Sequence, residues 1–228
     1  MKGMLELEYL GHSAFALRDG EAEVLIDPYL SENPKAPPSA KEVRPSLILV
    51  SHAHGDHVGD TVELSNRFDC PVLSTFEVGN VLAEMGAKVI PGHIGGDFEF
   101  PFGRVKMFPA VHSSSFDDVH VVGAPCSFLV TMGGHSVFHA GDTALFGDLA
   151  LIAEETVVEA ALLPVGGVYT MGIKDAVRAA RLLRAVKMVP MHYNTWEPIA
   201  VDEGEMREAV REQPFELVVL RPGERTML

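Results

Sequence analysis

Short β-type runs recur along almost the whole of this chain, and helix-type segments separate some of them. Helices are predicted at 56–67, 77–85, 174–186 and 202–212, and the segment 174–186 has the clearest apolar stripe at helical spacing. Gly133-Gly134 between two apolar runs predicts a hairpin turn. Strands interrupted by helices in both halves of the chain predict an α/β (α+β) fold, a four-layer αββα sandwich of two sheets with helices outside. The β-type runs cover residues 5–10, 14–17, 24–26, 47–50, 72–74, 88–90, 105–109, 127–131, 136–139, 161–164, 188–190 and 216–220.

The sequence shows no linker that would divide the chain, so we expect a single domain over residues 1–228. Its proline-rich segment 31–46 is expected to be a surface connection or a loop over a cleft, and not a helix or a central strand. The two cysteines, Cys70 and Cys126, exclude a disulfide framework and are typical of buried cysteines in a reducing cytoplasm.

The chain is acidic, with 18 Lys and Arg residues against 32 Asp and Glu residues and a formal net charge of −14. This charge repels phosphate backbones, which argues against nucleic acid or an anionic membrane as a partner. The N-terminal residues lack the apolar core of a signal peptide, and no apolar run approaches the roughly 18 residues of a membrane span. We therefore expect a soluble cytoplasmic protein.

The apolar run 47–50 is followed at once by three imidazoles and a carboxylate, those of His52, His54, Asp56 and His57. A strand end holds side chains at fixed positions above a rigid sheet. In extended backbone His52 and His54 point the same way, so both can bind one cation, while Asp56 and His57 can bind another. Without a metal ion such a cluster would be crowded and unsatisfied, so the pattern predicts a metal site.

The pattern His52-x-His54-x-Asp56-His57 is similar to the signature of the metallo-β-lactamase-fold hydrolases. Further motif residues of that superfamily occur in the same order, each just after a β-type run. They are Asp27, His112, Asp142 and His192. The segments 9–15, 141–143, 163–171 and 190–193 resemble more closely a compact branch of metal-dependent hydrolases near the ascorbate-6-phosphate lactonases. The resemblance covers nearly the whole chain and implies the αββα fold, but it does not imply a substrate.

The resemblance also implies two divalent metal ions per chain. Zinc is the expected metal, although manganese, iron and nickel also suit imidazole and carboxylate ligands. One ion would be bound by His52, His54 and His112 and the second by Asp56, His57 and His192, with Asp142 bridging both.

The candidate catalytic residues are Asp56 and Asp142, as metal ligands, and His12, which could donate a hydrogen bond to the substrate. Asp27 is expected to orient the 52–57 loop through hydrogen bonds, or else to be a turn residue. Tyr169 could reach a substrate oxygen. Structural roles stay open for His12 and Tyr169. The loops 31–46, 113–125 and 193–203 are expected to line the pocket.

These residues predict a hydrolase in which a hydroxide shared by two metal ions cleaves a small, anionic, ester-type substrate. A phosphodiester is favoured because its developing charge benefits most from paired cations, and a lactone is the alternative. A non-catalytic metal-binding or sensor module also stays open. An oxidoreductase with paired irons is disfavoured because no acidic residue replaces a histidine of the first motif. The resembling branch leaves a homo-oligomer open.

Overall fold

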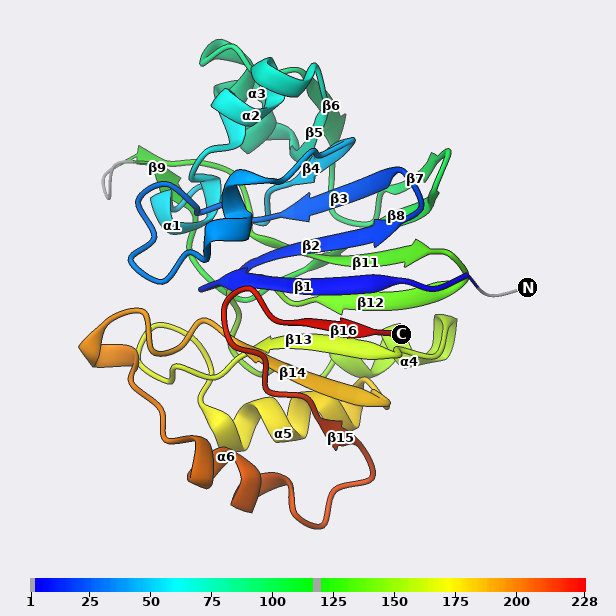
Figure 1. The fold of residues 1–228 in the computed structure, drawn as a ribbon, viewed down its shortest axis with the longest axis vertical. Coiled ribbons are helices and arrows are strands. Elements are labelled where there is room, and N and C mark those ends of the chain that lie inside the picture. Colours follow the sequence, from blue (N-terminus) through cyan, green and yellow to red (C-terminus); the bar gives the residue numbers. More distant parts are fainter. Residues whose placement is uncertain (1–2, 117–119) are drawn as a thin grey trace.

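The computed structural model describes residues 3–116 and 120–228 and contains two seven-stranded sheets (Figure 1). The first sheet has the order β16-β1-β2-β3-β4-β5-β6. Its strands are β1 (Glu6–Gly11), β2 (Ala14–Asp19), β3 (Ala22–Ile26), β4 (Leu47–Leu49), β5 (Val72–Thr75), β6 (Val89–Gly92) and β16 (Arg225–Met227).

The second sheet has the order β15-β14-β13-β12-β11-β8-β7. Its strands are β7 (Asp97–Phe100), β8 (Gly103–Pro109), β11 (Cys126–Met132), β12 (His135–His139), β13 (Ala160–Pro164), β14 (Lys187–Met191) and β15 (Glu216–Leu217). A separate two-stranded ribbon joins β9 (Ser115–Phe116) to β10 (His120–Val121), and residues 117–119 of the predicted loop 113–125 lie outside the described residues.

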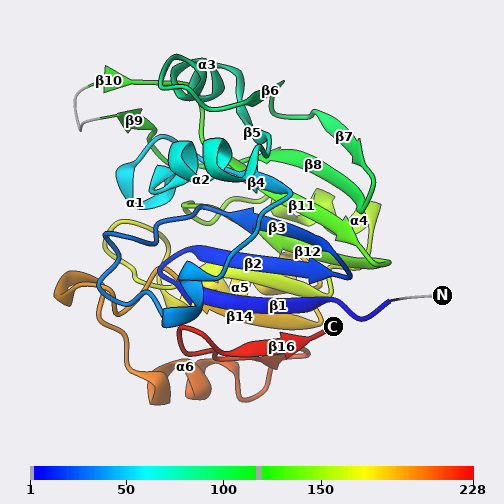
Figure 2. The same cartoon turned by 45° about the horizontal axis from the view of Figure 1, so that its top comes forward.

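Helices lie on both outer faces of the paired sheets (Figures 1 and 2). On the first sheet, α3 (Phe76–Glu84) packs against β5 and β6, and α1 (Gly55–Val58) and α2 (Thr61–Phe68) follow β4. On the second sheet, α5 (Ile173–Leu182) packs against β13 and contacts α4 (Leu149–Glu155) and α6 (Glu203–Val210). Two 3-10 turns, η1 (Pro38–Lys41) and η2 (Glu197–Ile199), lie in connecting loops. The predicted four-layer arrangement is confirmed.

Strand periodicity divides the apolar side chains of the run 47–50, which contains β4, between two core layers. Leu47 and Leu49 join the core between the sheets, whereas Ile48 and Val50 pack with residues of the helices that cover the outer face, among them Val78 of α3. This alternation follows from the two-residue period of a strand. Because both faces of this four-residue apolar run are buried, the run fixes the position of the residues that follow it.

The predicted hairpin at Gly133-Gly134 is confirmed. Met132 of β11 pairs with His135 of β12, and both glycines have positive φ, 59° and 83°. This combination is that of a type I′ turn, which matches the twist of the flanking strands and is readily formed by glycine.

The prediction of one continuous helix over 56–67 is wrong. The chain forms α1 and α2, separated at Gly59, whose φ is +42°. The other predicted helices are present as α3, α5 and α6, but α5 ends earlier than predicted because Arg184 turns to a positive φ of 46°. The segment 31–46, expected to contain no helix, includes the 3-10 turn η1. Helix α4 and strands β7, β9, β10 and β16 were not predicted.

Cys70 and Cys126 are buried free thiols. Within residues 3–116 and 120–228, every helix is too short or too polar to cross a bilayer.

Candidate metal centre

The candidate residues lie at the carboxyl ends of strands from both sheets. His12 follows β1, Asp27 follows β3 and the 52–57 cluster follows β4, all in the first sheet. In the second sheet His112 follows β8, Asp142 follows β12 and His192 follows β14. These strands run in the same direction within each sheet, so their ends meet at one edge of the sandwich.

Two groups of four side chains at this edge could each hold a metal ion. The first group is His52, His54, His112 and Asp142, and the second is His12, Asp56, His57 and His192. Within each group the ligand atoms all lie within 4.8 Å of one another. The structure thus brings together all seven residues expected to bind metal, and it adds His12 to the second group.

Asp142 belongs to the first group and also approaches the second. Its Oδ2 atom is 3.5 Å from Nε2 of His112, in the first group. It is also 3.1 Å from Nε2 of His192 and 3.3 Å from Nε2 of His57, both in the second group. One carboxylate oxygen therefore approaches imidazoles of both groups, which is the position that a bridging ligand needs.

Buried polar atoms in this centre lack hydrogen-bond partners. They are Oδ1 of Asp142, Nε2 of His57 and Nδ1 of His192. A buried polar atom without a partner costs free energy, and in native proteins such atoms point to an ion or another ligand. Imidazole nitrogens and carboxylate oxygens are suitable donors for a divalent transition metal. The residues present therefore fit two such ions.

The electrostatics of the centre depend on its buried carboxylates. Burial alone would raise the pKa of Asp142, but the charges of His57 and His192 outweigh it and hold this pKa well below the ordinary value. Burial lowers the pKa of His52 and of His112, which favours the neutral imidazoles that bind metal ions.

Asp27 is fully buried beneath the loop that carries the first motif. Its carboxylate accepts hydrogen bonds from the backbone N–H and the hydroxyl of Ser51, each at 2.7 Å, and from Nδ1 of His57 at 2.7 Å. Since Nδ1 of His57 donates to Asp27, its Nε2 is left facing the centre. This arrangement fixes the tautomer and the orientation of a candidate ligand.

Ser51 is a candidate positioning residue that was not predicted from the sequence. While its hydroxyl donates to Asp27, it accepts from Nδ1 of His52 at 2.9 Å, which directs Nε2 of His52 to the metal centre. Its position directly before the histidine motif was the available signal, because a hydroxyl there can bond to the loop it precedes.

His12 is 1% exposed and is bonded through both ring nitrogens. Nε2 is 3.0 Å from Oδ2 of Asp56, and Nδ1 is 2.8 Å from the hydroxyl of Thr195. Its carbonyl accepts from Tyr9 and from the backbone N–H of His192. Burial lowers the pKa of His12 to about 4, against the opposing effect of Asp56.

Three residues of the centre adopt left-handed backbone conformations, namely His12 (φ 57°), Asp27 (φ 46°) and His192 (φ 53°). For residues with a Cβ atom this conformation costs about 1–2 kcal/mol. The strain therefore lies at the residues directly after strand ends, where the backbone changes direction.

A small pocket of about 250 Å³ opens above the ligands. Tyr169, which is 58% exposed, and Trp196, which is 38% exposed, contribute aromatic rings to it. The Trp196 ring lies 4.8 Å from that of His12. Trp196 was missed as a site residue, since only the conformation of its loop brings it here. Of the predicted pocket loops, 113–125 contributes Ser113 and 193–203 contributes Trp196, whereas 31–46 contributes no residue to this pocket.

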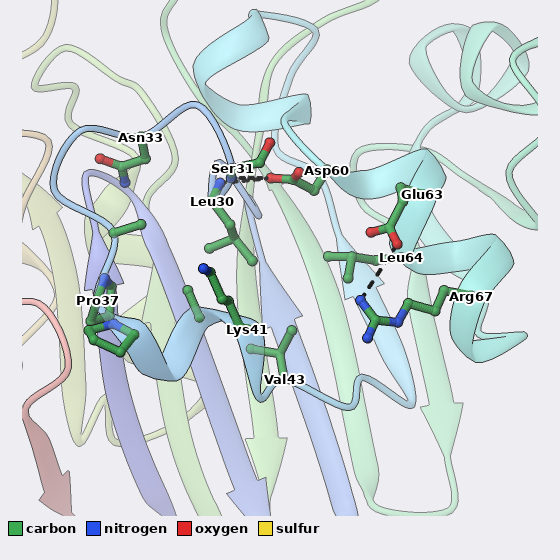
Figure 3. Close-up of a pocket in the computed structure, with 13 residues that line it drawn as sticks. Leu30, Ser31, Asn33, Pro37, Lys41, Val43, Asp60, Glu63, Leu64 and Arg67 are labelled. Carbon is green, nitrogen blue, oxygen red and sulfur yellow. Dashed lines mark hydrogen bonds and ion pairs between the residues drawn. The ribbon is translucent and has the colours of Figure 1, made fainter.

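The segment 31–46 lines a different and larger cavity, which lies between this segment and α2 (Figure 3). The loop therefore has a cavity beside it, but not the one that contains the candidate ligands.

Comparison with known proteins adds one family match over residues 6–192 and two relatives that span nearly the whole chain. Residues 6–192 match the Beta-lactamase superfamily domain. A UPF0173 metal-dependent hydrolase of Thermus thermophilus is 48% identical over 221 residues, which cover 97% of this chain and 98% of that protein. A UPF0173 metal-dependent hydrolase of Carboxydothermus hydrogenoformans is 42% identical over 226 residues, covering 98% and 100%.

Among solved structures, the metallo hydrolase Igni18 of the archaeon Ignicoccus hospitalis superposes with a TM-score of 0.89. It is 34% identical in sequence, and the match covers 99% of this chain and 98% of that one. Both the sequence and the arrangement of the two sheets are therefore shared with proteins described as metal-dependent hydrolases.

Proposed function

This chain belongs to the metallo-β-lactamase superfamily, among its UPF0173 metal-dependent hydrolases, and we propose that it hydrolyses a small anionic phosphodiester at a centre of two divalent metal ions. The single observation that supports two ions is the position of Asp142, which belongs to one group of four potential ligands and also approaches His192 of the other. When bound, paired divalent ions lower the pKa of water and stabilise negative charge on a phosphoryl oxygen. Zinc is the proposed metal.

The protein's own residues would position these ions and the substrate. His52, His54 and His112 would hold one ion, and Asp56, His57 and His192 the other, with Asp142 shared. Asp27 would keep the His57 ring in place. Since both ring nitrogens of His12 are engaged, by Asp56 and Thr195, we propose that His12 acts by positioning Asp56.

The pocket above the centre supports a small substrate. Its volume of about 250 Å³ is close to the lower end of small-molecule sites. Its two exposed aromatic rings, those of Tyr169 and Trp196, offer a surface for the part of the substrate that does not react, and the Tyr169 hydroxyl is a hydrogen-bond donor for a substrate oxygen. The net charge of −14 favours a small anion over a polyanionic polymer.

The test is hydrolysis of an activated phosphodiester by the full chain loaded in turn with zinc, manganese or nickel. We expect metal-dependent turnover that is lost in His54→Ala and retained in His93→Ala, because His93 is exposed and belongs to neither ligand group. No phosphodiester turnover with any metal, together with lactone hydrolysis, would replace the proposal with a lactonase. Metal binding without turnover of esters, lactones or thioesters would indicate a non-catalytic metal-binding module.

A further inference from the structure

The cavity beside segment 31–46 has about 650 Å³, a volume typical of small-molecule sites, and it contains no member of either metal-ligand group (Figure 3). Its walls come from residues 30–43 on one side and from Asp60 and helix α2 on the other. Prolines at 37 and 38 and the 3-10 turn η1 restrict the backbone of the first wall. The cavity is therefore largely formed before any ligand binds.

The inner surface of this cavity is apolar. Leu30, Ala40, Val43 and Leu64 all line it, and each is less than 9% exposed. These side chains come from separate segments and converge on one space. A hydrocarbon chain or ring of a ligand would remove the remaining apolar surface from water, which is favourable.

Two cations, Lys41 and Arg67, and two carboxylates, Asp60 and Glu63, line the cavity, and they differ in their partners. Asp60 Oδ2 accepts hydrogen bonds from the backbone N–H groups of Leu30 and Ser31, at 2.9 and 2.8 Å. Glu63 forms an ion pair with Arg67 at 3.7 Å. Lys41 has no ion-pair partner within residues 3–116 and 120–228, and in Figure 3 its side chain extends from η1 toward Leu30, over the cavity.

We propose that this cavity is a second ligand site, for an amphipathic monocarboxylate whose apolar body contacts Leu30, Val43 and Leu64 and whose carboxylate binds Lys41. A monoanion matches the single free ammonium group, and a charge-assisted hydrogen bond forms between them. A neutral apolar ligand would leave Lys41 unpaired. Binding at this site does not depend on the reaction at the metal centre.

The same chain segment separates this site from the metal centre. Leu30 faces the cavity, whereas the ring of its neighbour Tyr29 lies 5.9 Å from the ring of His12 and 6.3 Å from that of Trp196. The backbone N–H of Asp60 also bonds to the carbonyl of Pro28 at 2.9 Å. A ligand that packs against Leu30 therefore also restrains the segment that carries Tyr29. It acts in this way as an effector of the metal centre, because the ring of Tyr29 lies beside His12 and Trp196.

The test measures octanoate binding to the metal-loaded full chain by calorimetry. We expect one octanoate per chain, with octanol binding about tenfold more weakly because it lacks the charge that pairs with Lys41. Acetate serves as the control for carboxylate coordination at the metal ions, and its failure to reproduce the octanoate signal supports the site. Equal binding of acetate and octanoate would overturn it.

Two variants locate the site. Lys41→Gln should weaken octanoate binding about tenfold and leave octanol binding unchanged, while the exposed lysine variant Lys174→Gln on α5 should change neither. Ala36→Phe places a large ring at the cavity wall and should abolish binding of both ligands, with its fold checked by circular dichroism. Octanoate affinity that is unchanged in Lys41→Gln, or binding that is retained in folded Ala36→Phe, would overturn the proposal.

The effector role has its own measurement. Trp196 is the one tryptophan of the chain, so its fluorescence reports on the neighbourhood of Tyr29. Octanoate should change this emission in the wild type and not in Ala36→Phe. Octanoate binding with unchanged Trp196 emission would overturn the effector role.

Discussion

Nε2 of His12 lies 3.0 Å from Oδ2 of Asp56, which connects the end of the first strand to the metal-ligand motif 44 positions away in the sequence. The other ring nitrogen of His12 is bonded to Thr195, in the loop after the last ligand. One buried imidazole therefore links three separate segments around the second ligand group. Its burial and its two hydrogen bonds restrict the position of the Asp56 carboxylate.

Replacing this imidazole should weaken one metal site selectively. In His12→Ala we expect the affinity of the second ion to fall about 10- to 100-fold, because Asp56 loses the partner that orients it, while the first ion binds as before. Stepwise titration of the metal-free protein with zinc or cobalt measures both affinities. His93→Ala is the matched control. Unchanged affinity for both ions would mean that His12 does not support the second site.

The two buried aspartates should have different effects on metal content. Asp142→Ala removes the carboxylate that both groups approach, so we expect loss of both ions and of all activity. Asp27→Ala removes only the hydrogen bonds to Ser51 and His57, so we expect about a 10- to 100-fold loss of metal affinity or activity. Elemental analysis and activity at matched metal content measure the two effects. Equal losses in both variants would contradict the assignment of Asp142 as the shared ligand.

The ligand groups were predictable because strand ends are local features of the sequence. A polar, metal-binding side chain directly after an apolar run, as at His52 and Asp142, must project from the edge of a sheet. Because these strands run in the same direction within each sheet, their carboxyl ends and the side chains after them meet at one edge of the sandwich. The role of His12 in linking Asp56 to Thr195 could not be predicted, since it depends on two loops whose conformations are set by contacts between distant segments.

The errors in the predicted fold also have physical causes. Strand β7 (Asp97–Phe100) and strand β16 (Arg225–Met227) lie at sheet edges and contain charged residues, so they lack the apolar runs that identify inner strands. The break between α1 and α2 is a tertiary effect. The sequence 56–67 is compatible with a helix, but Gly59 packs closely against Pro28 and Tyr29, and this contact cannot be read from the local sequence.

The stability of the metal-free protein should decrease as the pH falls from about 6.5 toward 4. Burial lowers the pKa of His12 from 6.5 to about 4 and also lowers the pKa of His52 and His112. In this range the unfolded chain binds protons that the folded protein does not, so protonation favours unfolding. The shift at His12 alone corresponds to about 3 kcal/mol.

His57 contributes with the opposite sign. Asp142 and Asp27 raise its pKa well above 6.5 in spite of burial, so its stabilising effect is present below 6.5 and is lost as the pH rises through its folded pKa. Urea unfolding of chelator-treated protein from about pH 4 to well above 6.5 measures both effects, that of His12 below 6.5 and that of His57 above it. We expect the slope of stability against pH to be shallower in His12→Gln than in the wild type. An unchanged slope would show that His12 does not titrate between about 4 and 6.5.

The turn between α1 and α2 should tolerate no side chain at residue 59. A Cβ atom on Gly59 would lie 2.3 Å from the carbonyl oxygen of Pro28 and 2.6 Å from Cα of Tyr29, and neither backbone atom can move independently. Gly20 is the matched control, since it also has a positive φ, +59°, but a Cβ atom there would meet nothing within 4 Å.

Gly20→Ala should therefore cost only the left-handed conformation, about 1–2 kcal/mol, and leave metal binding unchanged. Gly59→Ala should cost more, because the backbone must separate at a turn that begins two residues after His57. That displacement moves a candidate ligand, so the loss of stability should be accompanied by weaker binding of the second metal ion. Urea unfolding and zinc titration of the two variants measure both quantities. Equal destabilisation in Gly20→Ala and Gly59→Ala would show that the contact with Pro28 does not restrict this turn.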